Sequence, residues 1–360
     1  MSILLLADSS AGAYACTLLA CELAQENLDC LVVRTDKPTS QLSPLPENPP
    51  GIGSVVQLHC SLNELLLSSL IVKAKAIGIF IQANAVEAFV MNYRQICQLH
   101  AQRPAPVFSG PVFPLVGDTL IEDLLPRMCC DLLCLHGERQ LEEAHDLMHR
   151  WPNPVPTVTI GFWFMPEAPE AGGLVGASKP NPPHTLVVLT QQGLPKQRGA
   201  EERMLRLLGQ KASASPHWQV VIQSDHNLPQ KTLPLNAKPG QVADLPKNIS
   251  FGAAGNLPLL LGRCSACITI SSPWIYTAMA WGRAVAVMAD HGIRADHGSV
   301  PFFSSGVMNR LDAISALDDL LEMPSVNSNW LEQMGWGVHE GATQLAEALR
   351  TLVKQEAIQR

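Results

Sequence analysis

Two adjacent serines, Ser271 and Ser272, stand where an apolar strand-like run (residues 266–272) meets a helix-like run (residues 273–282). The first turn of a helix offers unpaired N–H groups and the positive end of the helix dipole, so hydroxyls at this junction can bind a phosphate. Serine is also a preferred N-cap residue, and Pro273 suits the first helical position, where no N–H is needed. The pattern therefore predicts either a phosphate site or a simple helix cap.

A carboxylate, Asp8, ends the first apolar run of the chain and is followed by Ser9 and Ser10. A carboxylate at the end of a strand can take the proton of a substrate hydroxyl or hold that hydroxyl in place. Aspartate is also a common N-cap, and a helix-like run begins near Gly12. We therefore treat Asp8, Ser9 and Ser10 as substrate-side candidates, with helix capping as the alternative for Asp8. Asp118 is another acid in the same half of the chain.

Polar residues follow two further strand-like runs in the first half of the chain. Ser109 and Gly110 end one run, and the missing side chain of a glycine lets a substrate approach the backbone. His136 and Arg139 follow another run, and a guanidinium there can pair with a substrate carboxylate. An exposed position in the first turn of a helix is the alternative for Arg139. We expect all four residues near a substrate.

The sequence offers no pattern typical of a metal site. His291 and His297 are separated by five residues in a glycine-containing segment, which is not the spacing of two ligands on one helix face. Cys264 and Cys267 form a C-x-x-C pair, but no second Cys or His pair follows at zinc spacing. We therefore expect buried cysteines, no metal and no bound cofactor.

Short apolar runs alternate with longer helix-like runs along both halves of the 360-residue chain. This order predicts parallel sheets covered by helices on both faces, which is an α/β fold. Because single cores usually stop growing near ~250–300 residues, we expect two domains. The expected division is a first Rossmann-like domain over 1–160, a Pro/Gly-rich linker over 161–183, a second Rossmann-like domain over 184–340 and a C-terminal helix over 341–360. The substrate site is expected in a cleft that both sheets face.

Composition excludes several classes of protein. The net charge of −7 argues against a nucleic-acid-binding surface. We find no run of about 18 uncharged apolar residues, which argues against a transmembrane segment. The ten cysteines lie mostly in apolar segments, which is typical of reduced thiols in a cytoplasmic protein. The chain is therefore expected to be a cytoplasmic protein that neither binds nucleic acid nor spans a membrane.

Five segments, taken in order, resemble one known family. They are ILLLADSSAGAYACTLLA, VFSGPVFP, CDLLCLHGERQLEEA, LVVLTQQGLPKQRGAEERMLRLL and ITISSPWIYTAMAWGRAVAVM, within residues 3–320. Together they are similar to the glycosyltransferases grouped as domain-of-unknown-function family 6716. The strand–serine–helix–glycine–strand pattern also resembles GT-B glycosyltransferases, in particular bacterial sialyltransferase- and polysialyltransferase-like enzymes.

The resemblance implies roles for several residues. In such enzymes paired hydroxyls hold the donor phosphate, which gives that role to Ser271 and Ser272. The loop after the first strand of the donor domain approaches the nucleotide, and here it comprises Thr190, Gln191, Gln192 and Gly193. An acid of the first domain acts as catalytic base and a histidine contacts the donor phosphate, which makes Asp8 and His226 the catalytic candidates.

The resemblance implies transfer of a sialic-acid-like sugar from a CMP-activated donor, without a metal, to a glycan or lipid acceptor. A lipid acceptor leaves room for peripheral membrane contact. A UDP- or GDP-sugar GT-B enzyme or epimerase is the alternative, although residues 273–282 contain no acid to contact a ribose. A third possibility is a non-catalytic sugar-nucleotide-binding protein. Sialyltransferase-like enzymes commonly have a His-Pro pair and an acidic-Asp-Gly motif. Here His226 is followed by Asn227-Leu228-Pro229, and no acidic-Asp-Gly motif accompanies Asp8.

Overall fold

The computed structural model describes residues 2–35, 55–166, 184–191, 193–197, 199–224, 245–252 and 257–358. The chain divides into two compact units: Met1–Met165 with Leu331–Arg360, and Pro166–Trp330. Residues 331–340, which we expected in the second domain, group with the first unit. The reason is close backbone packing, because a Cβ at Gly335 would lie 2.6 Å from the carbonyl oxygen of His136.

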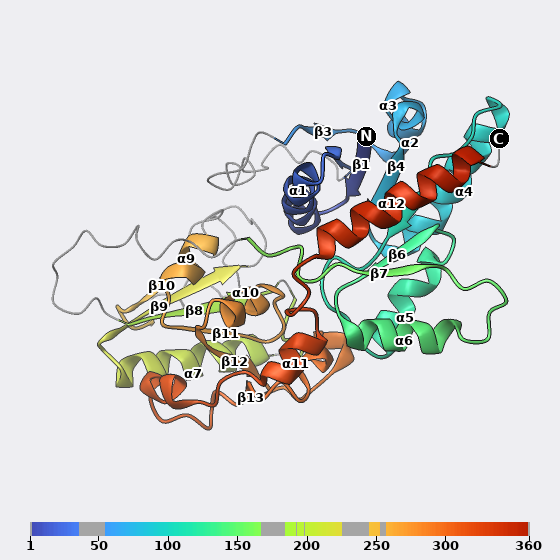
Figure 1. Cartoon of the computed structure of the whole chain (residues 1–360). Helices are drawn as coiled ribbons and strands as arrows, with labels where there is room; N and C mark the ends of the chain where they lie inside the picture. Colours follow the sequence, from blue (N-terminus) through green and yellow to red (C-terminus); the bar gives the residue numbers. More distant parts are fainter. Residues whose placement is uncertain are drawn as a thin grey trace. The chain divides into compact units, whose positions relative to one another are not determined.

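In the described part of the first unit, a seven-stranded sheet, sheet A, has the order β3-β2-β1-β4-β5-β6-β7, and all neighbouring strands are parallel. The strands are β1 (Ser2–Ala7), β2 (Asp29–Arg34), β3 (Gln57–His59), β4 (Ala76–Phe80), β5 (Val107–Ser109), β6 (Leu132–Leu135) and β7 (Thr157–Thr159). The helices are α1 (Ser10–Gln25), α2 (Leu62–Leu66), α3 (Ser69–Lys73), α4 (Ala83–Leu99), α5 (Asp118–Leu124), α6 (Glu138–Met148) and α12 (Gly341–Ile358). Figure 1 shows the C-terminal helix α12 beside β7 and α1, with which it is in contact.

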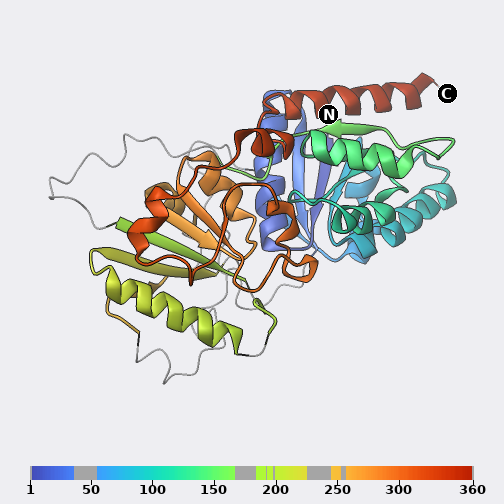
Figure 2. The ribbon, with the colours of Figure 1, turned by 90° about the horizontal axis from the view of Figure 1, so that it is seen from below.

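In the second unit, the described strands form a six-stranded parallel sheet, sheet B, with the order β10-β9-β8-β11-β12-β13. The strands are β8 (His184–Thr190), β9 (Trp218–Ser224), β10 (Ile249–Phe251), β11 (Ala266–Thr269), β12 (Ala284–Met288) and β13 (Met308–Asn309). The helices are α7 (Ala200–Ala214), α9 (Leu257–Arg263) and α10 (Trp274–Ala280), and α11 (Ser328–Gln333) spans the boundary between the units. Figure 2 shows α7 on one face of sheet B and α9 and α10 on the other.

The burial of the central strands explains why they could be predicted from the sequence. All five residues of β4 are buried, as are the last five of β1, because helices cover both faces of sheet A. A parallel strand covered on both faces needs apolar residues at every position, so it appears as an uninterrupted apolar run. The expected α/β fold with two Rossmann-like domains is confirmed.

The expected linker begins later than residue 161. Phe162, Trp163 and Phe164 are buried in the first unit, and the Trp163 ring lies 4.7 Å from the ring of Phe80 on β4. These aromatic side chains therefore belong to the core of the first unit and not to a connecting segment. Residues 167–183 lie outside the described residues.

Two further expectations concern composition. All ten cysteines are described and none is in a disulfide; Cys264 and Cys267 are buried in the second unit. Among the described helices, none combines the length and apolar character needed to cross a membrane.

Candidate functional site

The strand order of sheet B reverses between β8 and β11, and polar groups from both strands meet there. Gln191 follows β8 and Ser271 follows β11. The backbone N–H of Ser271 donates to Gln191 Oε1 at 3.2 Å, and the Ser271 hydroxyl lies 2.9 Å from the same oxygen. This hydroxyl also contacts the carbonyl oxygen of His297, from the segment after β12. Ligands of open α/β sheets bind outside the strand ends at such a reversal, so this cluster is a candidate site.

The two adjacent serines face different surroundings. Ser272 is fully buried, and its hydroxyl has no hydrogen-bond partner in the structure, whereas its N–H donates to Thr269 Oγ1 at 3.0 Å. Ser271 keeps 9% of its surface exposed. The N-cap of α10 is Pro273, without a side-chain hydrogen bond, so neither serine acts as the cap. Only Ser271 presents its hydroxyl to the polar cluster, and Ser272 is directed into the protein.

Thr190 and Gly193, two other candidates at the end of β8, have structural roles. Thr190 is 4% exposed, and its hydroxyl lies 3.4 Å from the carbonyl oxygen of Gln223 on the neighbouring strand β9, which makes it a sheet residue. Gly193 has a φ of 74°, and no atom lies within 4 Å of where a Cβ would stand, so it serves an open turn. Gln192 and His226 lie outside the described residues.

A hydrogen bond from a backbone N–H to a side-chain oxygen also links two strand ends at the point where the strand order of sheet A reverses. Asp8 follows β1, and its Oδ2 accepts the N–H of Gln82, which follows β4, at 2.7 Å. The cap of α1 is Ser9, whose hydroxyl accepts the N–H of Gly12 at 3.1 Å, so the alternative that Asp8 caps this helix is wrong. Ser10 is the first residue of α1. Asp8 is thus a partly exposed carboxylate at the switch point of sheet A.

Ser109 and Gly110 have structural roles, in contrast to the expectation. Ser109 is fully buried; its hydroxyl donates to the carbonyl of Ile79 and accepts from Arg127 Nη1 at 2.7 Å. A Cβ at residue 110 would lie 2.0 Å from the carbonyl oxygen of Cys134 on β6. Gly110 therefore gives room to a neighbouring strand and not to a substrate, and Ser109 anchors a buried arginine.

His136 and Arg139 do not line an open site either. The His136 side chain is fully buried, and its Nδ1 lies 2.7 Å from the carbonyl oxygen of Gly161, so this nitrogen carries the proton. Burial lowers the pKa of His136 to about 4, although nearby backbone carbonyls oppose the shift. Arg139 lies in the first turn of α6, as its alternative expected, but it is only partly exposed and pairs with Glu143 at 3.4 Å along the helix.

The buried neutral His136 predicts a loss of stability in acid. Its pKa is about 4 in the folded chain and about 6.5 when unfolded, so unfolding takes up a proton between these values. The free energy of unfolding should therefore fall by ~3 kcal/mol as the pH is lowered from 6.5 to 4. Urea titrations at pH 7 and pH 4.5 should show a smaller acid loss in His136→Gln. The matched control His145→Gln, at an exposed position on the following helix α6, should retain the full loss, and equal losses in both variants would contradict the assignment.

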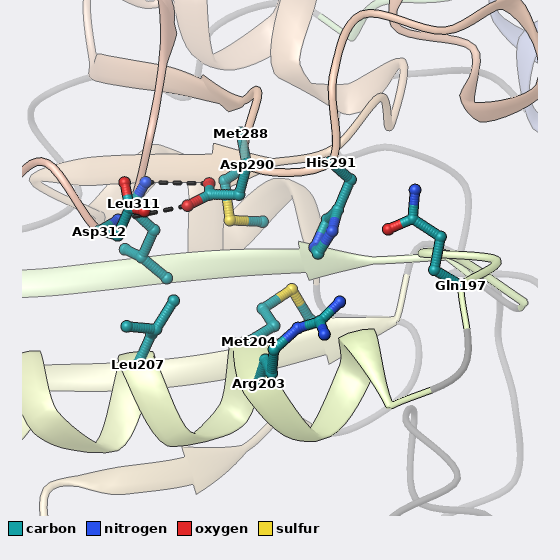
Figure 3. A pocket seen from close by; sticks show the side chains of 9 residues that line it. All are labelled: Gln197, Arg203, Met204, Leu207, Met288, Asp290, His291, Leu311 and Asp312. Carbon is teal, nitrogen blue, oxygen red and sulfur yellow. Dashed lines mark hydrogen bonds between the residues drawn. The ribbon is translucent and has the colours of Figure 1, made fainter.

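A pocket of about 200 Å³ lies at the same edge of sheet B, on the α7 side. It is lined by Gln197, Arg203, Met204, Leu207, Met288, Asp290, His291, Leu311 and Asp312. Figure 3 shows the guanidinium of Arg203 directed toward His291, beside Met204. The Asp290 carboxylate accepts hydrogen bonds from two backbone N–H groups, those of Leu311 at 2.9 Å and Asp312 at 3.2 Å (Figure 3).

The sequence interpretation missed Arg203 and Gln197. Both follow β8, the same strand that led to Gln191, but a helix-like run beginning near residue 199 was taken as an ordinary covering helix. The rule that ligands bind at strand ends could have included the connection from β8 into α7.

Solved structures of similar fold extend over the whole chain. UDP-GlcNAc 2-epimerase from Methanocaldococcus jannaschii has a TM-score of 0.63 at 10% identity, covering 98% of this chain and 100% of its own. The Neisseria meningitidis UDP-GlcNAc 2-epimerase bound to UDP-GlcNAc has a TM-score of 0.59 at 13% identity, with coverage of 98% and 100%. The glycotransferase of kitacinnamycin has a TM-score of 0.54 at 12% identity, with coverage of 98% and 99%. At these identities the likeness defines the fold, which is GT-B.

The family follows from the sequence. A family profile matches residues 8–352, and the chain belongs to this family, described as "Putative glycosyltransferase (DUF6716)". No curated protein matches the sequence significantly. The family expected from the five ordered segments is thus confirmed.

Proposed function

We propose that this chain is a glycosyltransferase that moves a sugar from a nucleoside diphosphate sugar of the UDP type to an acceptor hydroxyl. The observation that carries the proposal is the cluster of Gln191, Ser271 and His297 at the switch point of sheet B. A leaving phosphate needs hydrogen-bond donors that stand ready at the position where its charge develops. The family description supports the transferase class.

Gln191 and Ser271 supply the donors in this proposal. Because Gln191 Oε1 accepts the N–H of Ser271, the amide orientation is fixed and Nε2 is the donor end of the side chain. Gln191 Nε2 donates to no other described residue, which leaves it available to a phosphate oxygen. The Ser271 hydroxyl carries a single hydrogen, so binding a phosphate requires it to leave the carbonyl of His297.

UDP is favoured over CMP as the nucleotide of the donor. Structures of the same fold that cover nearly the whole chain include an S. aureus MnaA–UDP complex and the Neisseria meningitidis epimerase bound to UDP-GlcNAc. The CMP-activated, sialic-acid-like donor expected from the sequence resemblance finds no support among these structures. The experiments below test for this CMP-activated donor and also for epimerisation of a UDP-sugar without an acceptor.

On the acceptor side we propose Asp8 as the base that takes the proton of the acceptor hydroxyl of a glycan or lipid. One of its oxygens is held by the Gln82 N–H, and the side chain is partly exposed. His226, outside the described residues, stays a proposed partner of the donor phosphate. Metal-independent transfer also stays a prediction, tested by comparing turnover with magnesium and with EDTA.

A thermal-shift panel of UDP, GDP, CDP and CMP tests the donor site. A ligand at about 100 times its Kd stabilises by ~2.7 kcal/mol, which corresponds to ~5–10 °C for a unit of this size. We expect UDP to give the largest shift. Ser271→Ala should weaken UDP binding by about ten-fold, because a hydrogen bond to a charged group is lost. Ser272→Ala should bind UDP like the unmodified chain, since the Ser272 hydroxyl is buried away from the cluster.

The alternative outcomes are distinct. A larger shift with CMP would restore the sialyltransferase-like interpretation. Weaker binding in Ser272→Ala than in Ser271→Ala would place the phosphate on the other serine. If no nucleotide shifts the melting temperature, the switch point of sheet B is not a nucleotide site. Carbon-13 NMR of the sugar product separates transfer to an acceptor from epimerisation.

A further inference from the structure

The pocket beside α7 combines apolar side chains with a guanidinium, that of Arg203, which pairs with no described carboxylate. Its two carboxylates are already engaged: Asp290 accepts two backbone N–H groups, and Asp312 pairs with Arg310 at 2.9 Å. Arg203, by contrast, is exposed, and its guanidinium makes no hydrogen bond or ion pair with a described residue. A guanidinium that pairs with no carboxylate and lies beside apolar side chains is a suitable partner for an anion.

A second, independent observation concerns two neighbouring histidines, of which only His291 lines the pocket. The rings of His291 and His297 lie 6.4 Å apart at 79°, and His291 lines the pocket. His297 is only 2% exposed, and neither of its ring nitrogens has a hydrogen-bond partner. A buried imidazole without any partner is costly, so a missing ligand atom near it is the natural explanation.

We propose that this pocket binds a phosphate group between Arg203 and His291, with His297 next to them as a second imidazole partner. The pocket of about 200 Å³ is smaller than the ~300–1,000 Å³ of sites that enclose whole ligands, so it takes one group of a larger molecule. The inference rests on the proposed function, because the phosphate belongs to the nucleotide donor or to a free phosphate compound.

The site has a built-in proton linkage. Burial lowers the pKa of both histidines in the free chain, and Arg203 lowers that of His291 further. The charged groups that act on these rings are Asp290, Asp296, Arg203, Arg294 and Lys196. A bound phosphate raises the pKa of an adjacent imidazole, so binding takes up a proton at a pH between the free and bound values. Affinity therefore increases as the pH is lowered through this window.

Calorimetry on the full chain tests the site with UDP, UMP, inorganic pyrophosphate and uridine. We expect Arg203→Gln to weaken the three phosphate compounds by about ten-fold and to leave uridine unchanged, because one charge-assisted contact is lost. The matched control Arg206→Gln, exposed on the same helix but outside this pocket, should bind all four like the unmodified chain. Equal binding by Arg203→Gln and Arg206→Gln overturns the proposal.

The outcomes of this calorimetric experiment distinguish the proposed function from the proposed phosphate site, and a nucleotide from a free phosphate compound as the source of the phosphate. Tight UDP binding that is indifferent to Arg203 keeps the proposed function and rejects this site. Pyrophosphate binding that depends on Arg203, without any nucleotide binding, keeps this site and rejects the proposed function. Loss for pyrophosphate but not for UDP or UMP assigns the site to a free phosphate compound.

Proton uptake on binding distinguishes histidines that contact the phosphate from histidines with a purely structural role, because only the former change their protonation when the ligand binds. Titrations with UDP at pH 7.0 in two buffers of different ionisation enthalpy give the number of protons bound. We expect net uptake in the unmodified chain and less uptake in His297→Gln and in His291→Gln, while protonation of UDP itself cancels in the difference. The same uptake in all three proteins removes the histidines from the site.

Discussion

Replacing Asp8 by asparagine should slow sugar transfer by ~10²–10⁴-fold, the usual contribution of a positioned general base. Asparagine keeps a carbonyl oxygen that can accept the Gln82 N–H, which now lies 2.7 Å from Asp8 Oδ2, so the local backbone should be preserved. It cannot take a proton from the acceptor hydroxyl. The rate is measured as release of free UDP from the UDP-sugar that stabilises the chain most, with a mixture of glycan and lipid acceptors.

Asp118 provides the matched control for this prediction. It is an exposed acid at the start of α5 in the same unit. Asp118→Asn should leave the rate unchanged, and both variants should retain the UDP-induced rise in melting temperature. A slow Asp118→Asn together with a normal Asp8→Asn would move the base to Asp118. Normal rates in both would remove the acceptor-side assignment altogether.

Replacing Arg127 by methionine should lower the free energy of unfolding of the first unit by ~3–5 kcal/mol. The Arg127 side chain is 3% exposed and donates to both carboxylate oxygens of Asp123, at 2.8 and 3.0 Å. It also donates to the Ser109 hydroxyl and to the carbonyls of Ile79 and Ile81. Removing the guanidinium leaves a largely buried carboxylate and several acceptors without partners, and each such group costs free energy.

The control for Arg127 is a second Arg–Asp pair of the same unit. Arg94 contacts Asp131 at 2.9 Å, but the two side chains are 38% and 35% exposed. Water screens such a pair, so Arg94→Met should cost no more than ~1 kcal/mol. Urea unfolding, followed by circular dichroism, gives both values. A loss below 1 kcal/mol in Arg127→Met would show that its network contributes little to stability.

This arginine also explains why sequence reasoning misjudged part of the first unit. Ser109, Gly110 and His136 each lie at the end of a strand, as Asp8 does, and their types suited substrate binding. Their directions depend on partners elsewhere in the chain: Ser109 reaches Arg127, and His136 reaches Gly161. A strand end fixes the edge of the sheet at which a residue lies, but not whether its side chain turns outward.

The sequence alone determined the two parallel sheets, because strands covered on both faces must be uninterrupted apolar runs. It also determined which polar residues stand at strand ends, including Asp8, Gln191 and Ser271. Only the tertiary structure decided which of them meet. The bonds Asp8–Gln82 and Gln191–Ser271 join residues 74 and 80 positions apart, so they exist only once strands distant in sequence lie side by side. The same packing buries Ser272 while its neighbour Ser271 stays at the site.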